Sequence, residues 1–381
     1  MKFLHLADLH IGKSVNGFSM LEEQANAFRQ IKKYVQSERP AAVLIAGDVY
    51  DRAVPSVEAV RLFDDFLTDL AHEKTVVLLI AGNHDSPERI GFANRLLSEQ
   101  QLFLRGIYDE NSQPVTLSDE YGEVHFWPLP FLKPSDLREN ADTQPESYQD
   151  AFALALDRMP INLTQRNVLI AHQFFAAPGI VPLFSESELN PIGGLDAIDA
   201  ALLRAFDYTA LGHLHRSQTI GRDVVRYAGS PIKYSFSECR HEKSVTMVEL
   251  GAKGDLHIRE LPITPLHDMR EIKGSLELLL SDEIAGQEDP EDYLRVILTD
   301  EEEIIDPLGK VRSVYKNVMS LDFENTRTQL VLDHISTESE NVATTSPYDL
   351  FNDFFLEING NVMSLAQCQL VMELMETEAK R

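Results

Sequence analysis

Five clusters of carboxylate, amide and imidazole side chains follow apolar runs of the sequence and could bind divalent metal ions. They are Asp8-Leu9-His10, Gly47-Asp48, Gly82-Asn83-His84-Asp85, His172 and Gly212-His213-Leu214-His215. Each cluster offers oxygen or imidazole ligands, and none offers a thiolate. This ligand set suits Mn²⁺, Fe²⁺, Zn²⁺ or Mg²⁺ better than a structural zinc site. Because ligand sites in open α/β sheets gather at the carboxyl ends of strands, we expect these clusters to meet there.

The spacing within the clusters suggests how the ligands meet. Asp8 and His10 are two residues apart, as are His213 and His215, so on an extended strand each pair would face one side. The glycines of the clusters let the backbone turn sharply beside the ligands. Two metal ions about 3.5–4 Å apart need a bridging carboxylate, for which Asp48 is the candidate. Such a pair of ions would bind a scissile phosphate, lower the pKa of a bridging water and stabilise the developing charge.

His84 is predicted to play a different role, because it follows Asn83 directly instead of pairing with a ligand across a strand face. It could contact a phosphate oxygen or protonate the leaving group. Ser86 and Pro87 are typical of the N-cap and first turn of a helix, whose N-terminus would favour phosphate. Arg89 could add to that attraction, although a surface position is the simpler expectation.

Each motif alone has an ordinary structural interpretation. Asp48 after a glycine is commonly a turn residue, and His172 alone is commonly a buried, hydrogen-bonded histidine. The joint pattern is more specific. The chain has 12 histidines, and the five that the site requires all fall at predicted strand ends, whereas the other seven show no such pattern.

Length and composition bound the class of protein. The 381 residues suggest two or three domains, and no apolar run is long enough to span a membrane. The N-terminus turns polar too early for a signal peptide, so a cytoplasmic location is expected. The two cysteines, Cys239 and Cys368, are far apart, which argues against a disulfide framework and a thiolate zinc site.

The formal net charge of −27 opposes nucleic-acid binding, which usually draws on lysine and arginine. Three interpretations remain open. The acidic residues lie far from the site, or metal ions supply the local positive charge, or a partner subunit makes most of the DNA contacts.

Apolar runs alternate with amphipathic stretches over about the first 230 residues, which predicts an α/β fold. The predicted strands are Lys2–Leu6, Ala41–Ala46, Thr75–Ala81, Val124–Pro128, Val168–Ala171, Tyr208–Leu211 and Val224–Ala228. The predicted helices are Met20–Gln36 and Ser56–Ala71, and a hairpin is predicted from Val245–Leu250 and Leu256–Glu260.

A domain boundary is predicted near Pro262–Pro265. A small β-α-β-α-β unit follows, with strands at Met269–Ile272, Tyr293–Leu298 and Val318–Asp322 and helical stretches near Ser275–Leu280 and Pro307–Val314. The predicted division is therefore a first domain at 1–265, a small α/β unit at 266–325, a polar linker at 326–345 and a helical segment at 346–381.

The motifs in this order resemble the calcineurin-like metallophosphoesterase family, whose signature is Asp-x-His, Gly-Asp, Gly-Asn-His-Asp/Glu, a His and Gly-His-x-His. The stretches 1–12, 46–51, 211–215 and 227–231 are similar to the SbcD-type nucleases of that family. The resemblance covers residues 1–235 and implies a sandwich of two mixed β-sheets flanked by helices. It also implies two divalent metal ions, usually Mn²⁺, with Mg²⁺ as the alternative.

The resemblance implies a role for each site residue. It assigns one metal ion to Asp8, His10, Asp48 and His215. It assigns the other metal ion to Asp48, Asn83, His172 and His213, and it makes His84 the catalytic histidine. Residues 266–325 would be a capping domain that shapes DNA access, and 346–381 would bind the coiled-coil base of an SbcC-type ATPase.

The implied activities are ATP-dependent 3′–5′ exonuclease on double strands and endonuclease on single strands, acting on DNA ends and hairpins in repair, replication and recombination. The implied assembly is a homodimer, formed through helices near 56–71 and 87–99, inside a heterotetramer at the nucleoid, with no membrane contact. One departure is the stretch Val49-Tyr50-Asp51-Arg52, which has no histidine where archaeal and eukaryotic counterparts have one.

Two other functions compete with this interpretation. The chain could be a phosphodiesterase acting on a small nucleotide, although about 115 residues after Leu266 would then have no evident use. Alternatively, it could be a binding module with a residual metal site, which the intact ligands at every matched position oppose.

Overall fold

The computed structural model describes residues 1–111, 113–137, 145–180, 182–188, 197–286 and 289–326, with a few scattered residues between 351 and 371. The predicted linker beyond residue 326 and most of the predicted helical segment at 346–381 lie outside the described residues. Within the described part, no helix combines the length and apolarity that crossing a membrane requires.

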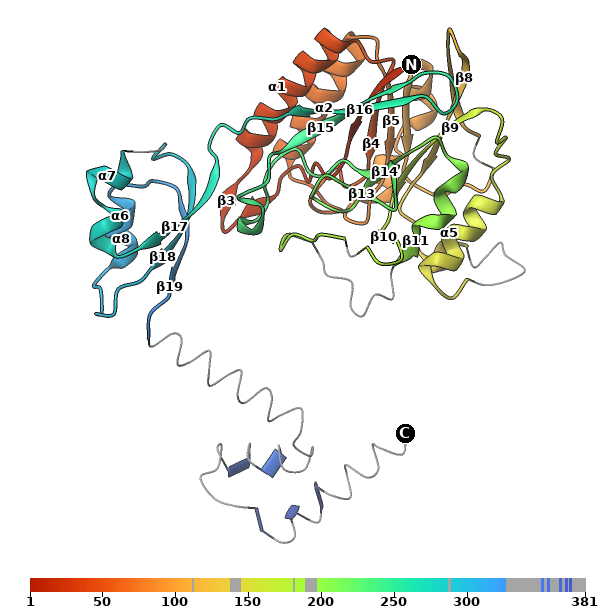
Figure 1. Ribbon diagram of the computed structural model, residues 1–381. Coiled ribbons are helices and arrows are strands. Elements are labelled where there is room, and N and C mark those ends of the chain that lie inside the picture. The colour runs from red at the N-terminus through yellow and green to blue at the C-terminus, as the bar shows by residue number, and fades with distance from the viewer. Residues whose placement is uncertain are drawn as a thin grey trace.

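Two six-stranded mixed sheets form the centre of the first domain (Figure 1). The first sheet has the order β16 (Leu256–Pro262), β15 (Ser244–Leu250), β1 (Lys2–Leu6), β4 (Ala42–Ala46), β5 (Val76–Ile80) and β6 (Leu102–Arg105). The second has the order β13 (Gln218–Ile220), β14 (Arg222–Tyr227), β12 (Tyr208–Gly212), β9 (Arg166–His172), β8 (Gly122–Leu129) and β7 (Val115–Asp119). Neighbouring strands from β1 to β6 and from β14 to β8 run parallel.

The two sheets pack face to face through fully buried side chains. Phe3 of the first sheet contacts Phe126 and Tyr208 of the second, with ring centroids 5.5 and 5.6 Å apart. Helices α1 (Leu21–Glu38) and α2 (Val57–His72) bury their apolar sides on the outer face of the first sheet. Helix α5 (Tyr148–Asp157) covers the second sheet. The predicted α/β sandwich of two mixed sheets is therefore confirmed.

Predicted and observed elements agree closely where the apolar runs are long. Each predicted strand exists within two residues of its predicted ends, and so do the two long helices. The edge strands β6 and β7 and the helix α5 were not predicted. Both missed strands are half-exposed, and their weak alternation of apolar and polar residues resembles a loop.

A small unit at 269–323 follows the sandwich. Its three strands, β17 (Met269–Gly274), β18 (Tyr293–Leu298) and β19 (Val318–Phe323), are all parallel. The connections contain the short helices α6 (Leu276–Leu279), α7 (Asp282–Ala285) and α8 (Pro307–Arg312). The unit has its own apolar core, which includes Leu294, Val296 and Val311. Figure 1 shows it beside the sandwich, connected through the segment after β16.

Candidate metal centre

The parallel strands of the two sheets end at one common edge, where their loops face one another. In the first sheet, β1 ends before Asp8, β4 before Asp48 and β5 before Asn83. In the second sheet, β9 ends at His172 and β12 ends before His213. Because the chain direction is the same in all five strands, the polar residues that follow them converge between the sheets.

The structure brings together the residues predicted to bind the first metal ion. His10 Nε2 lies 3.0 Å from His215 Nε2 and 3.6 Å from Asp48 Oδ2. Ligand atoms of Asp8, His10 and His215 all lie within 4.8 Å of one another. Asp8, His10, Asp48 and His215 are all at most 3% exposed.

The residues predicted to bind the second metal ion also meet. His172 Nε2 lies 3.3 Å from Asp48 Oδ2 and 3.0 Å from Asn83 Oδ1. His213 Nδ1 lies 3.1 Å from the same Asn83 oxygen. Asp48 therefore faces histidines from both predicted sets, as a bridging carboxylate requires.

Two buried polar atoms indicate that the cluster fits a cation. Asp8 Oδ2 and His10 Nδ1 have no hydrogen-bond partner among the described residues. Leaving a buried carboxylate oxygen without a partner costs about 1–3 kcal/mol or more. The contact between two imidazole nitrogens of His10 and His215 is likewise more natural when both lone pairs face a shared cation. The hard oxygen and imidazole donors suit Mn²⁺ and related ions.

The charges of these side chains depend on one another. Burial raises the pKa of Asp8 well above its usual range. Burial acts in the same direction on Asp48, but the neighbouring His172 and His10 outweigh it and hold the pKa of Asp48 well below its usual range. Burial alone would lower the pKa of His172, but the Asp48 and Asp8 carboxylates together raise it to about 9. Positive charge from an imidazolium thus stabilises the buried carboxylates, and bound metal ions would replace it.

Left-handed backbone conformation is concentrated at the site. Asp8, His10, Asp48 and His213 have φ values of 53°, 41°, 50° and 108°. Such values are uncommon for residues other than glycine and are found often at functional sites. The expected geometry of paired residues on one strand face is therefore wrong. Both pairs lie beyond the strand ends, and tight loops bring their side chains together instead.

The cluster glycines have separate structural reasons. Gly47 has a φ of 86°, so it turns the chain as predicted. A Cβ atom at Gly82 would lie 2.1 Å from Asp48 Oδ1, and one at Gly212 would lie 2.0 Å from the carbonyl oxygen of Ala46. These two glycines are therefore needed for close approach between loops rather than for a turn.

Hydrogen bonds fix His84 beside the cluster. Its backbone N–H donates to Asp48 Oδ1 over 2.9 Å, and its Nδ1 lies 2.9 Å from the carbonyl oxygen of Asp51. The loop without a histidine thus orients His84 through its backbone. Pro87 begins α3 (Pro87–Ile90), but this helix has four residues, and the Ser86 side chain bonds Glu88 rather than capping it. The helix therefore gives weak support for phosphate binding.

Asp85 fastens two of the loops to each other. Its Oδ2 accepts from the backbone N–H groups of Gly82 and Val49 over 2.9 and 3.1 Å, and its Oδ1 accepts from Tyr50 over 2.9 Å. Burial raises the pKa of Asp85 to about 6. The sequence placed this residue in a cluster but did not identify its role, which is to hold the Asp48 loop against the Asn83 loop.

A second layer of polar side chains lies behind His215. Ser187 Oγ lies 2.8 Å from His215 Nδ1 and donates to Glu238 Oε1 over 2.7 Å. Glu238 is fully buried and forms an ion pair with Lys243 over 2.5 Å. Lys243 also donates to the His215 carbonyl oxygen over 2.9 Å. This arrangement fixes the ring so that Nε2 points toward His10, in the way that outer-layer groups orient metal-binding histidines.

Replacing Ser187 with alanine tests this second layer. We expect about a 10-fold loss of Mn²⁺ affinity in isothermal titration calorimetry, because His215 loses the partner that orients its ring. Ser185→Ala is the matched control, since that hydroxyl lies in the same loop and has no hydrogen-bond partner among the described residues. Equal affinity of the Ser187 and Ser185 variants would contradict the orienting role.

Comparison with known proteins places this site in a family. Residues 1–217 match the calcineurin-like phosphoesterase family, and residues 265–359 match a domain described as type 5 capsule protein repressor C-terminal domain. A protein of Staphylococcus epidermidis, named as the SbcD subunit of nuclease SbcCD, is 30% identical over 380 residues, covering 98% of both chains. A protein of the same name from Staphylococcus saprophyticus is 27% identical over 379 residues, again covering 98% of both chains.

Solved structures with a related fold are more distant in sequence. A dimetal phosphatase from Danio rerio is 12% identical, with a TM-score of 0.39 over 70% of this chain and 99% of that one. A protein from Thermus thermophilus is 11% identical, with a TM-score of 0.39 over 68% of this chain and 98% of that one.

Proposed function

Because the chain belongs to the calcineurin-like phosphoesterase family and, within it, to the SbcD-type nuclease subunits, we propose that it is a metal-dependent DNA nuclease. The main support is the convergence of the predicted ligands from five loops of two sheets at one buried point. The proposed reactions are 3′–5′ exonuclease on double strands, driven with ATP by a partner, and endonuclease on single strands and hairpins.

The proposed metal ions are two, with Mn²⁺ preferred and Mg²⁺ as the alternative. Asp8, His10, Asp48 and His215 would hold one ion. Asp48, Asn83, His172 and His213 would hold the other. When bound, such a pair of ions supplies charge stabilisation for the phosphodiester and a nucleophile at neutral pH. The contacts of Asp48 with His10 and His172 support its role as the shared ligand.

His84 is the proposed proton donor to the leaving group. A carbonyl oxygen can only accept, so the contact with Asp51 requires that His84 Nδ1 carries a proton. Nε2 is then the atom that exchanges a proton with the substrate. The ring lies edge-on to His10, with centroids 4.8 Å apart, which places it at the border of the metal cluster. Its half-buried position leaves it accessible to a bound phosphodiester.

The proposed partner is an SbcC-type coiled-coil ATPase, which the names of the relatives suggest. The net charge of −27 is consistent with a division of labour, in which the ATPase makes most of the DNA backbone contacts. Residues 346–381 are the proposed binding segment for that ATPase, and residues 266–325 the proposed capping domain. Association with the nucleoid follows from the DNA substrate.

A homodimer is proposed through α2 and the segment after it at residues 87–99. Large apolar side chains there are exposed to solvent, and a cluster of such residues indicates an interaction site. They are Val57 at 60%, Val60 at 44%, Phe92 at 78% and Leu96 at 70% exposure.

Replacing Phe92 with glutamate should shift the protein from dimer to monomer, because a charge would replace an apolar anchor. We expect at least a 10-fold weaker self-association in size-exclusion chromatography with light scattering. Ile305→Glu is the control, since Ile305 is 83% exposed but belongs to the small unit. A Phe92 variant that stays dimeric would place the interface elsewhere.

The decisive assay is digestion of a labelled DNA hairpin with Mn²⁺, with and without the ATPase and ATP. The proposal requires cleavage that depends on the metal ion and increases with the ATPase. Turnover of a generic phosphodiester that DNA does not inhibit would instead favour the small-nucleotide phosphodiesterase.

A further inference from the structure

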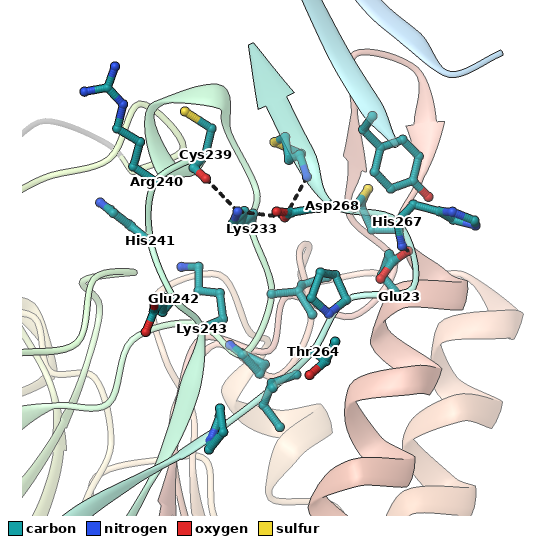
Figure 2. Close-up of a pocket in the computed structure, with 18 residues that line it drawn as sticks. Glu23, Lys233, Cys239, Arg240, His241, Glu242, Lys243, Thr264, His267 and Asp268 are labelled. Atoms are coloured by element: carbon teal, nitrogen blue, oxygen red, sulfur yellow. Dashed lines mark hydrogen bonds and ion pairs between the residues drawn. The ribbon is translucent and has the colours of Figure 1, made fainter. Parts of the chain in front are cut away.

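Two neighbouring residues of α1 bind two different parts of the molecule. The Glu23 carboxylate accepts from the backbone N–H groups of Leu266 and His267 over 2.8 and 2.9 Å. These two residues connect the sandwich to β17, and Figure 2 shows Glu23 beside His267. Glu23 is only 2% exposed, so its carboxylate has little other solvation. It therefore anchors the connection to the small unit.

The next residue, Gln24, binds the loop that contains His10. Its amide nitrogen donates to the carbonyl oxygens of His10 and Leu9 over 2.8 and 3.3 Å. Its amide oxygen accepts from the backbone N–H of Gly12 over 3.0 Å. Gln24 is 1% exposed, so these bonds account for most of its polar capacity. The side chain thus stabilises the loop in which His10 has a left-handed conformation.

A second pair of neighbours repeats this division. Lys233 Nζ forms an ion pair with Asp268 over 2.7 Å and donates to the Cys239 carbonyl oxygen over 2.7 Å (Figure 2). The next residue, Tyr234, donates its hydroxyl hydrogen to the Leu9 carbonyl oxygen. Gln24 also donates to the Tyr234 hydroxyl over 3.0 Å, which connects the two pairs.

The junction between the sandwich and the small unit is incompletely packed. A cavity of about 350 Å³ lies there, and both sides line it, including Met20 and Lys233 of the sandwich and Met269 and Tyr293 of the small unit. Close-packed interfaces resist displacement, whereas a void permits small shifts without overpacking. The anchors formed by Glu23 and Lys233 therefore have a large share in fixing the position of the small unit.

We infer that Gln24 and Tyr234 are positioning residues for His10, and that Glu23 and Lys233 couple the position of the small unit to them. A shift of the connection at 266–268 changes the load on Glu23 and Lys233. Each is bonded through one peptide to the residue that holds the His10 loop. The inference deepens the proposed function, because it rests on His10 as a metal ligand.

Thermodynamic reciprocity makes the coupling measurable from both ends. If docking of the connection strengthens metal binding by some factor, metal binding must strengthen docking by the same factor. The first end is the Mn²⁺ affinity, measured by isothermal titration calorimetry. The second is hydrogen exchange of the backbone amides of Leu266 and His267, which the Glu23 carboxylate protects.

The principal variant of the full chain is Glu23→Gln, which keeps the side-chain size but removes one of the two acceptor oxygens. We expect faster exchange at Leu266 and His267 and a loss of Mn²⁺ affinity of about 5-fold. In wild type, Mn²⁺ should slow exchange at the same amides. Glu22→Gln is the matched control, because Glu22 is the exposed neighbour in the same helical turn.

A double variant separates coupling from two independent defects. Gln24→Met should weaken Mn²⁺ binding directly, and adding Glu23→Gln should then have little further effect on affinity. Additive losses, or faster exchange in Glu23→Gln with unchanged Mn²⁺ affinity, would overturn the inference. Unchanged exchange in Glu23→Gln would overturn it as well, because the anchor itself would be absent.

Failure of the proposed function has a different signature. If wild type binds no Mn²⁺, the metal assignment is wrong. The exchange of the Ile11 and Gly12 amides in Glu23→Gln then still tests transmission to the His10 loop. Faster exchange there supports the coupling, and unchanged exchange contradicts it.

Discussion

Replacing Asp48 with alanine is expected to reduce Mn²⁺-dependent cleavage of a DNA hairpin by on the order of 10³-fold or more. The carboxylate lies between His10 and His172, so its removal takes away the proposed shared ligand of both ions. It also removes the acceptor for the backbone N–H of His84. Metal binding and the orientation of the catalytic histidine therefore fail together.

The experiment needs a control for acidic residues in general, because the chain is strongly acidic. Asp65→Ala removes an exposed carboxylate of α2 and should leave cleavage and Mn²⁺ affinity unchanged. Thermal unfolding of both variants without metal checks that the sandwich is intact. Hairpin cleavage by Asp48→Ala within a few-fold of wild type would refute the shared-ligand assignment.

The positions of the candidate ligands could be predicted because they depend on strand ends. Runs such as Ala42–Ala46 and Val76–Ile80 are completely apolar, and each fits a parallel strand buried on both faces. A polar residue directly after such a run must lie at the carboxyl end of the sheet. This argument needs no knowledge of loop conformation, and it placed Asp48 and Asn83 correctly.

Loop conformation and long-range partners could not be predicted in the same way. The left-handed conformations of Asp8 and His10 follow from contacts with other loops, such as the bond from the His10 N–H to the Asp48 carbonyl oxygen. Glu238 lies 51 residues after Ser187 in the chain, and no local pattern relates either to His215. Glutamate and serine are common surface residues, so only the folded chain identifies these two as partners of a ligand.

The acidic composition becomes less puzzling once the local charges are considered. Near the cluster, Lys243 neutralises Glu238, and Lys13 forms an ion pair with Asp51 over 2.8 Å. The buried carboxylates Asp8 and Asp48 face histidines rather than free lysines. Positive charge for a phosphodiester must therefore come mainly from bound metal ions. The chain could then be acidic overall without losing the local attraction that catalysis needs.

Replacing His84 with glutamine is expected to reduce cleavage by about 10²–10⁴-fold and to leave Mn²⁺ affinity unchanged. Glutamine can still donate a hydrogen bond to the Asp51 carbonyl oxygen, but it cannot transfer a proton at the position of Nε2. The backbone N–H that donates to Asp48 is retained, so the loop should keep its conformation. Loss of rate without loss of metal thus distinguishes His84 from the ligands.

The leaving group decides whether this loss reflects proton transfer. A substrate with a good leaving group, such as a nitrophenyl phosphodiester, needs little protonation, so His84→Gln should slow it much less than it slows DNA. Equal losses on both substrates would instead indicate that His84 binds the phosphate. Full activity on DNA would contradict both roles and favour a binding module with a residual metal site. Because Asp48→Ala should slow both substrates alike, the two variants separate proton donation from metal binding within one assay.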